Sequence, residues 1–256
     1  TKAYNRPYGL VLVTGPTGSG KSTTLYATLG DVAKPEINII TVEDPVEFRM
    51  RGINQVQVNN KAGMTFAAAL RSILRTDPDV VLIGEIRDQE TANIAIEASL
   101  TGHLVLSTLH TNDAPSAVTR LTEMGVEPFL LSSSLAAVMA QRLARRLCKK
   151  CKRQDTATEA ELRTLGVPHM PDTPLPTIWR PVGCRECANT GYSGRVAIQQ
   201  VMGVDSTMED LIARGATSID IDKAAKEQGM TTLRKDGWQK ALQGITSVEE
   251  VLRVTV

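Results

Sequence analysis

Short apolar runs alternate with longer amphipathic stretches over the first half of the chain. The runs are rich in β-branched residues, as expected of strands that are buried on both faces, and they cover residues 10–13, 37–42, 80–83 and 104–106. The stretches between them have the composition and apolar spacing of helices, and they cover residues 21–29, 65–75 and 89–100. This strand-then-helix order predicts a mainly parallel sheet with helices on both sides.

Other elements follow from the same periodicities. Residues 55–58 alternate polar and apolar positions, which indicates a half-exposed strand. The second half of the chain favours helices over residues 115–124 and 128–147, a strand over residues 195–202 and short helices from residue 206 onwards. A polar stretch rich in proline lies between them, at residues 169–181.

Composition narrows the class of protein. Of 256 residues, 42% are hydrophobic and 22% are charged, which is typical of a globular protein and excludes disordered and collagen-like chains. The net charge of +1 argues against a surface that attracts nucleic acid everywhere. The longest stretch without Asp, Glu, Lys or Arg, residues 98–112, is too short and too polar for a membrane-spanning helix, and no signal peptide is visible. The chain opens without Met close to a buried strand, which we interpret as a fragment of a longer protein.

A glycine-rich segment joins the first predicted strand to the first predicted helix. It matches the pattern G-x-x-x-x-G-K-[ST] without a gap, in the strand-turn-helix context that this pattern requires. Glycines allow successive backbone N–H groups to point at phosphate, while Lys21 would bridge the terminal phosphates and the Ser22 hydroxyl would ligate Mg²⁺. The residues expected to bind the nucleotide are Gly15, Pro16, Thr17, Gly18, Ser19, Gly20, Lys21, Ser22 and Thr23.

Acidic residues follow two of the other predicted strands. Glu85 comes just after residues 80–83, and Glu43 and Asp44 come just after residues 37–42. Ligands of open α/β sheets bind at the carboxyl ends of the strands, where hydrolysis needs one carboxylate to orient water and another for the Mg²⁺ shell. The alternative is that these acids cap a helix or a turn.

Two of the three histidines flank the last strand of the first half. His103 and His110 are expected near opposite ends of that strand and of the turn that follows it. A histidine in such a place is equally often a hydrogen-bonding residue of the core.

The four cysteines form two C-x-x-C pairs. Cys148 and Cys151 are separated from Cys184 and Cys187 by 32 residues, enough for both pairs to converge on one tetrahedral Zn²⁺ ion in a closed structural site. Free thiols or a redox pair are the alternative. Residues 142–153 contain seven basic residues and no acid, which either offset the charge of four thiolates or form a surface for anionic lipid or an acidic partner.

Taken together, these motifs resemble those of the bacterial secretion ATPases, the family of type II secretion and type IV pilus assembly. Residues 15–22 resemble the Walker A motif of this family, residues 41–48 its Asp box, residues 82–88 its atypical Walker B motif and residues 101–111 its His box. The motifs occur in the order of the family, and residues 122–146 with the cysteine pairs extend the similarity over nearly the whole chain.

The resemblance implies roles for the candidate residues. Glu85 would be the catalytic carboxylate, Glu43 and Asp44 would assist at the metal or the water, and His103 and His110 would sense or position the γ-phosphate. A hexameric ring would convert ATP hydrolysis into work on an inner-membrane platform protein, at the cytoplasmic face of the inner membrane. An upstream domain of the same protein, absent from these residues, would cover the nucleotide and contribute arginines. Within this sequence the candidates for phosphate contact are Arg71, Arg75 and Arg87.

The predicted architecture is α/β. We expect a RecA-like P-loop ATPase core with a mainly parallel sheet over residues 1–146, a tetracysteine zinc element over residues 147–194 and a mainly helical region over residues 195–256. The predicted function is that of a Mg²⁺-dependent ATPase motor for pilus assembly or type II secretion.

Two other functions compete with this one. The first is a nucleic-acid-dependent P-loop motor, or a DNA-uptake ATPase, with a zinc ribbon. The near-neutral charge and an aromatic content of 4% argue against direct contact with nucleic acid. The second, a structural subunit that does not hydrolyse ATP, is disfavoured because acids are present at both strand ends.

Overall fold

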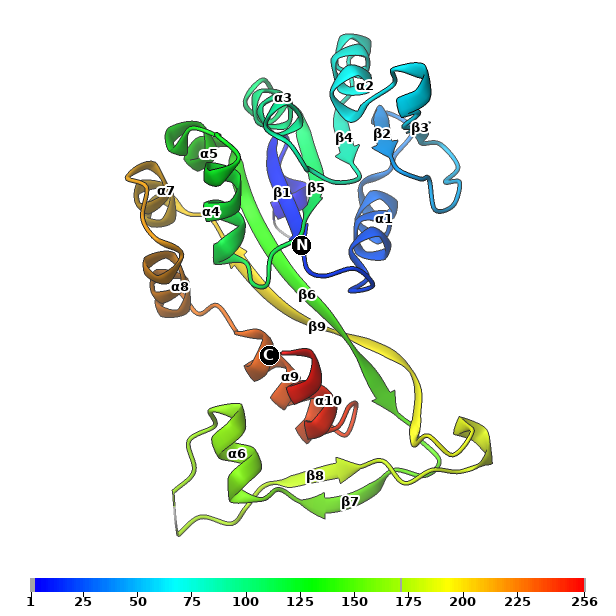
Figure 1. The fold of residues 1–256 in the computed structure, drawn as a ribbon, viewed down its shortest axis with the longest axis vertical. Coiled ribbons are helices and arrows are strands. Elements are labelled where there is room, and N and C mark those ends of the chain that lie inside the picture. Colours follow the sequence, from blue (N-terminus) through cyan, green and yellow to red (C-terminus); the bar gives the residue numbers. More distant parts are fainter. Residues whose placement is uncertain (1–2, 171, 256) are drawn as a thin grey trace. The chain divides into compact units, whose positions relative to one another are not determined.

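The protein folds into two compact units, each made from two separate parts of the chain (Figure 1). The computed structural model describes residues 3–170 and 172–255, so residue 171 of the predicted proline-rich stretch lies outside the described residues. Unit 1 comprises Thr1–Ala140 and Val201–Met230, and unit 2 comprises Gln141–Gln200 and Thr231–Val256. The predicted segment boundary at residue 146 falls inside strand β6 (Leu135–Leu147), and the one at residue 194 falls inside β9 (Tyr192–Gly203). Each of these two strands contributes residues to both units.

Unit 1 is built on a sheet whose described pairings are parallel. The sheet has seven strands in the order β3-β2-β4-β5-β1-β6-β9. Its other strands are β1 (Gly9–Thr14), β2 (Ile39–Glu43), β3 (Asn54–Gln57), β4 (Val80–Ile83) and β5 (Leu104–Leu109). Strand β1 pairs in parallel with β5 and β6, β2 with β3 and β4, and β4 with β5. The prediction of a mainly parallel sheet is confirmed, and so is the half-exposed strand β3.

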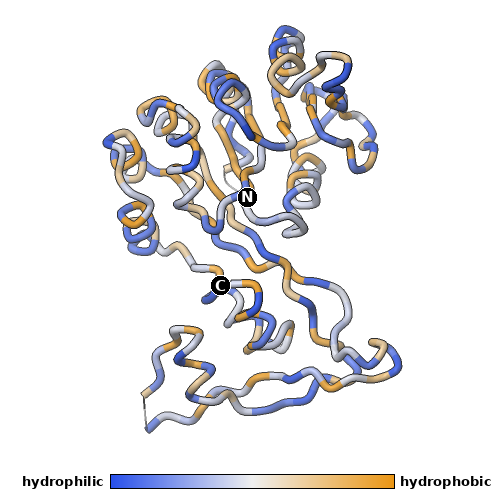
Figure 2. The backbone as a smooth tube through the Cα atoms, in the orientation of Figure 1, coloured by the Kyte–Doolittle hydropathy of each residue, from blue (hydrophilic) through white to orange (hydrophobic). Residues whose placement is uncertain are grey.

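Alternate residues of the strands point to opposite faces of the sheet, and both faces are covered. On β1, Leu10 and Leu12 belong to one hydrophobic cluster, whereas Val11 and Val13 belong to the other. Figure 2 shows the hydrophobic strands at the centre of this unit. The second cluster includes residues of α1 (Lys21–Val32). The first includes residues of α2 (Phe66–Ile73), α3 (Gln89–Leu100), α4 (Pro115–Glu123), α5 (Pro128–Ser134), α7 (Ser206–Ala213) and α8 (Ser218–Glu227).

The predicted helix over residues 128–147 is wrong in its second part. Helix α5 ends at Ser134, and Leu135–Leu147 forms strand β6 beside β1. Ala, Leu and Arg favour helix by intrinsic propensity, but that preference is worth only tenths of a kcal/mol per residue. Val138 and Ala140 are fully buried in the sheet, and burial with backbone pairing outweighs the local preference.

Unit 2 has a small core of its own. Strands β7 (Arg153–Thr156) and β8 (Thr177–Arg180) form an antiparallel pair, and the helices are α6 (Glu159–Leu165), α9 (Leu233–Leu242) and α10 (Val248–Val254). The core contains Leu162, Ile178, Trp238 and Val251. The predicted strand over residues 195–202 lies within β9, and the short helices after residue 206 are confirmed.

Short turns of 3₁₀ helix occur in both units, at η1 (Ala3–Asn5), η2 (Asn60–Ala62), η3 (Leu74–Thr76) and η4 (Arg185–Cys187). No helix within the described residues is long and apolar enough to cross a membrane.

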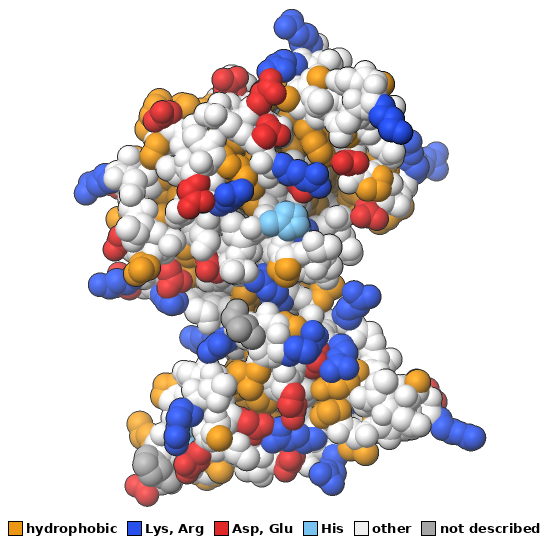
Figure 3. All heavy atoms as spheres, in the orientation of Figure 1, with side chains coloured by type: hydrophobic (Ala, Val, Ile, Leu, Met, Phe, Trp, Pro, Cys, Tyr) orange, Lys and Arg blue, Asp and Glu red, His pale blue; other side chains and the backbone are white. Residues whose placement is uncertain are grey.

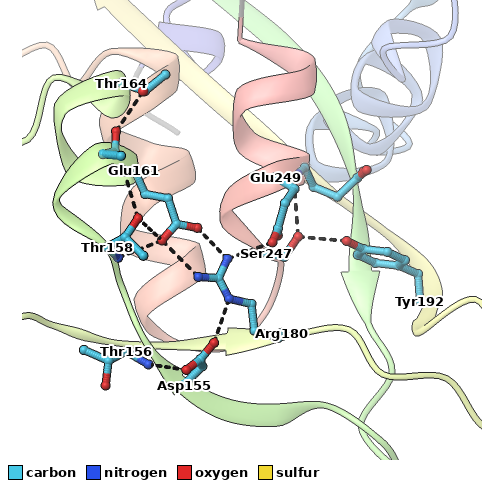
Figure 4. Close-up of polar contacts among 11 residues, drawn as sticks. Asp155, Thr156, Thr158, Glu161, Thr164, Arg180, Tyr192, Ser247 and Glu249 are labelled. Carbon is cyan, nitrogen blue, oxygen red and sulfur yellow. Dashed lines mark hydrogen bonds and ion pairs between the residues drawn. The ribbon is translucent and has the colours of Figure 1, made fainter.

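Arg180 joins several elements of unit 2 (Figure 4). Its guanidinium donates to Asp155 on β7 (3.0 Å), to Glu161 on α6 (2.5 and 2.9 Å) and to Glu249 on α10 (2.7 Å). These hydrogen bonds hold the pKa of Glu161 below its usual range. One side chain of β8 therefore fixes three neighbouring elements.

Glu250 is a buried carboxylate in the same unit. It is 1% exposed and accepts hydrogen bonds from the backbone N–H of Arg145 (2.9 Å) and from the guanidinium groups of Arg145 (2.6 Å) and Arg253 (2.7 and 2.8 Å). Burial opposes its ionisation, but these donors outweigh burial and lower the pKa of Glu250 from 4.5 to about 2. The carboxylate is therefore charged whenever the protein is folded near neutral pH.

We expect Glu250→Gln to lower the free energy of unfolding by about 3 kcal/mol at pH 7. Because the pKa of Glu250 is lower in the folded state, its contribution is complete above about pH 4.5 and is lost as the pH falls towards 2. The loss of stability in the variant should therefore shrink with acidification, as urea denaturation at pH 7 and pH 3 would measure. Glu249→Gln is the matched control, since the Glu249 side chain is 54% exposed and its ion pair should contribute less than about 1 kcal/mol. Equal losses at both pH values would contradict the assignment.

Candidate functional site

The glycine-rich segment leaves the end of β1 and enters α1, as predicted. Gly18 and Gly20 have φ angles of 78° and 85°, which other residues rarely adopt, and Gly20 directly precedes the first residue of the helix. The first N–H groups of a helix lack helical acceptors and bind anions. Lys21 Nζ donates to the carbonyls of Gly15 (2.9 Å) and Pro16 (3.2 Å), so its ammonium group lies over this loop. The segment therefore has the backbone geometry of a phosphate site.

The acidic strand ends meet beside this loop. Strand β5 lies between β1 and β4, and β2 lies on the other side of β4. Neighbouring strands are about 4.8 Å apart, so the end of β4 is about 10 Å from the end of β1, where the glycine-rich loop begins. Hydrogen bonds connect these ends: Thr111 N to Thr14 Oγ1 (2.8 Å), Thr108 Oγ1 to Gly84 O (2.7 Å), and Gly84 N to Val42 O (2.8 Å).

Glu85 follows β4 and has two basic neighbours. Its side chain is 14% exposed, pairs with the Arg87 guanidinium and lies 3.6 Å (Oε2) from His110 Nε2. The hydrogen bond to Glu85 raises the pKa of Arg87, and the charge of Asp44 adds to this effect. On the face of unit 1 seen in Figure 3, a histidine lies among acidic and basic side chains. The structure thus brings Glu85, His110 and Arg87 together, with Asp44 near them.

His103 lies at the other end of β5. Its carbonyl accepts the N–H of Gly9 at the start of β1 (3.1 Å), and its Nδ1 lies 2.9 Å from Ala98 O. A strand of this length separates it from the glycine-rich loop by about 20 Å. The structure does not bring His103 to the phosphate site of this chain, and its contacts fit the alternative of a hydrogen-bonding residue.

Glu43 and Asp44 face different surroundings. Glu43 is 4% exposed, and its carboxylate accepts hydrogen bonds from Thr41 Oγ1 (2.5 Å), Gln55 Nε2 (3.2 Å) and the Tyr26 hydroxyl. Asp44, the next residue, is exposed. The sequence did not indicate Tyr26 as a partner of this site; the available signal was a hydroxyl-bearing aromatic residue on the second turn of the helix that follows the glycine-rich loop.

The other two predicted arginines have different surroundings. Arg71 pairs with Glu90, and both side chains are exposed. Arg75 is exposed on η3, in the segment that leads into the start of β4. Of the three candidates, Arg87 is the one that contacts Glu85.

The four cysteines converge in unit 2. Their sulfur atoms lie within 4.8 Å of one another, and three of the pairs are 3.8 to 3.9 Å apart. A tetrahedron with Zn–S bonds of about 2.3 Å has edges of about 3.8 Å, so the arrangement fits Zn²⁺, whereas a disulfide needs about 2.05 Å. The residues that would hold the ion are Cys148, Cys151, Cys184 and Cys187.

Backbone N–H groups surround these sulfur atoms. Gly183 donates to Cys151 Sγ (3.3 Å), and Cys184 (3.2 Å) and Gly191 (3.3 Å) donate to Cys187 Sγ. Burial opposes ionisation of Cys187, but its two backbone donors help to lower the pKa of this thiol to about 6, whereas burial raises the pKa of Cys151 to about 11. N–H donors of this kind stabilise thiolates, the form that binds metal.

Comparison with known proteins agrees with the geometry. The family described as type II/IV secretion system protein matches residues 1–253. The chain belongs to this family. Type II secretion system protein E of Aeromonas hydrophila is 53% identical over 255 residues, which cover 100% of this chain and 50% of the relative. The type IV pilus assembly ATPase PilB of Thermus thermophilus is 52% identical over 255 residues, 29% of its length. The chain thus spans half or less of the length of these curated relatives.

Two solved structures, of a pilus motor and of an ATPase, share the fold. The pilus retraction motor PilT with bound ADP has a TM-score of 0.74 and 28% identity, covering 99% of this chain and 63% of that chain. The ATPase DotB of Legionella pneumophila has a TM-score of 0.70 at 22% identity and supports the fold alone. The predicted family and the α/β fold class are confirmed, and the nucleic-acid alternative gains no support from these secretion and pilus proteins.

Proposed function

We propose that the protein is a Mg²⁺-dependent ATPase that powers type IV pilus assembly or type II secretion. The observation that carries the proposal is that the Glu85 carboxylate after β4 lies 3.6 Å from His110 Nε2 after β5, the strand beside β1, which leads into the glycine-rich loop of a member of the secretion family. Relatives at this level of identity are described as a secretion protein E and a pilus assembly ATPase.

Each residue of the site has a role in this proposal. The backbone N–H groups of residues 17–22 would bind the phosphates, Lys21 would neutralise their charge, and the Ser22 hydroxyl would hold Mg²⁺. Mg²⁺, when bound, withdraws charge from the phosphate oxygens. Glu85 accepts a hydrogen bond from the attacking water, and Arg87 and His110 hold its carboxylate in place until then. The exposed Asp44 would hold water near that ion.

Zn²⁺ serves a structural role in this proposal. Four thiolates leave no open position for a substrate, so the ion would stabilise unit 2. A tetrathiolate zinc centre carries a net charge of −2, which the basic residues at 142–153 help to offset.

The assembly around the site is also part of the proposal. We infer a homo-hexameric ring at the cytoplasmic face of the inner membrane, acting on a platform protein there, with an upstream domain of the same protein over the nucleotide. Family membership and the exposed sides of Arg87 and His110, which can face a neighbouring subunit, support this arrangement.

We expect the specific ATPase activity to rise with protein concentration. Subunits that complete one another's sites are active only when assembled, so dilution should reduce phosphate release per molecule. Phosphate release measured over a range of concentrations, with Lys21→Ala as the background at each one, tests this expectation. A constant specific activity would contradict sites shared between subunits, and ATP binding without turnover at any concentration would contradict an ATPase site complete in these residues.

A further inference from the structure

Tyr26 connects the helix that follows the phosphate loop to the segment that carries Asp44. Tyr26 lies on the second turn of α1 and is 3% exposed. Its hydroxyl donates to Glu43 Oε2 and accepts the backbone N–H of Glu47 (3.2 Å). Its ring packs edge-to-face on the ring of Phe48, with centroids 4.5 Å apart. A single buried side chain therefore contacts the chain both before and after Asp44.

The carboxylate of Glu43 is held on both of its oxygens. Tyr26 donates to Oε2, whereas Thr41 and Gln55 donate to Oε1. A buried carboxylate that turned away from these donors would lose hydrogen bonds without gaining water. Glu43 is thus fixed in the interior, and Asp44 is the acid of the pair that reaches solvent beside Arg87.

The phenol of Tyr26 is a permanent donor. Burial and the hydrogen bond to Glu43 raise its pKa to about 12, so the hydroxyl stays protonated at physiological pH.

The loop that follows β2, residues 44–50, is also supported by two side chains of β3. Gln57 accepts the N–H of Val46 (3.3 Å), and Gln55 accepts the N–H of Met50 (2.7 Å). The loop is held by β3 on one side and by α1, through Tyr26, on the other.

We propose that Tyr26 is a positioning residue for ATP hydrolysis: through Glu43 and the backbone of Glu47, it fixes the position of Asp44 relative to Lys21 and Ser22 on the same helix. The inference rests on the proposed ATPase function. Catalytic groups that are misplaced by about 1 Å lose on the order of 10²-fold in rate, so a hydrogen bond that sets their spacing is measurable in turnover.

The decisive variant is Tyr26→Phe, which removes only the hydroxyl. We expect kcat to fall about 10- to 100-fold while the KM for ATP changes less than about threefold, because the phosphate loop is untouched. Phe48→Ala, at a residue that is 56% exposed, removes the ring contact and should lower kcat by a smaller factor of about 3. Steady-state kinetics below the unfolding temperature of each variant measure both effects.

Tyr4→Phe is the matched control. Tyr4 makes one hydrogen bond to the same helix, from its hydroxyl to Asp31 (3.2 Å), at an exposed position far along α1 from Lys21. The chemical change is identical, so kcat should remain that of the wild type. A loss in Tyr4→Phe equal to that in Tyr26→Phe would overturn the inference, because it would indicate a general effect on α1.

A double-mutant cycle with Glu43→Gln separates positioning from general destabilisation. Because Tyr26 and Glu43 share one hydrogen bond, the kcat loss of the double variant should be smaller than the product of the two single losses. Losses that multiply, or an unchanged kcat in Tyr26→Phe beside an active wild type, would overturn the inference alone. Absence of turnover in the wild type, with ATP binding retained, would overturn the proposed function and this inference with it.

Discussion

Replacing Glu85 by glutamine should reduce ATP turnover by about 10²- to 10³-fold while ATP binding changes less than about twofold. The substitution keeps the size of the side chain but removes the charge that pairs with Arg87 and that, in the proposed function, orients water. The glycine-rich loop follows β1, which β5 separates from β4, so the substitution should leave the loop's conformation and its affinity for the nucleotide unchanged. Phosphate release and binding of a fluorescent ATP analogue measure the two quantities on the same preparation.

Glu90→Gln is the control for this prediction. Glu90 lies in the first turn of α3, pairs with Arg71 and is 58% exposed, so the same change of charge there should leave turnover within about twofold. Turnover preserved in Glu85→Gln would show that another residue is the catalytic carboxylate. Asp44 would then be the next candidate, because it is exposed at the neighbouring strand end.

Removal of the metal from the cysteine cluster should unfold unit 2. Binding free energies of about 10 kcal/mol or more for a structural Zn²⁺ exceed the stability of a small core, so the double variant Cys184→Ser with Cys187→Ser should lose both zinc and cooperative unfolding of this unit. We expect about one Zn²⁺ per chain in the wild type and none in the variant. Elemental analysis and thermal unfolding followed by tryptophan fluorescence test this, because both tryptophans, Trp179 and Trp238, lie in unit 2.

Nucleotide binding provides the internal control for the zinc prediction. The phosphate loop lies in unit 1, so the cysteine variant should still bind ATP. Protein purified without chelator that contains no zinc, or a cysteine variant as stable as the wild type, would contradict a structural metal site. The opposite result, loss of ATP binding together with zinc, would show that the two units do not fold independently.

Much of unit 1 was predictable because its signals are local. The apolar runs that became β1, β2, β4 and β5 are buried on both faces of a parallel sheet, and such strands need no partner information to be recognised. The glycine-rich loop is recognisable because the residues that its backbone conformation requires are consecutive in the sequence. Two C-x-x-C pairs predict a metal site by their spacing alone.

What required the tertiary structure was every feature that depends on neighbours distant in sequence. The sequence predicted a helix for residues that form β6, because propensity is local whereas the pairing of β6 with β1 is not. The family resemblance implied one role for His103 and His110, which the sequence placed near opposite ends of a strand, and the structure shows that only His110 lies beside Glu85. The sequence also could not give the order of the strands in the sheet. That order places a single strand, β5, between β4, which precedes Glu85, and β1, which precedes the glycine-rich loop.

The sequence by itself thus determined the chemical groups of this protein: the phosphate loop, the strand-end acids and the four thiols. The tertiary structure decided which of them meet. Glu43 and Asp44 are adjacent in sequence, yet burial by Tyr26, Thr41 and Gln55 makes one a fixed interior carboxylate and leaves the other exposed. The physical reason is that a side chain's role depends on its solvation and hydrogen-bond partners, which are supplied by segments that only folding brings together.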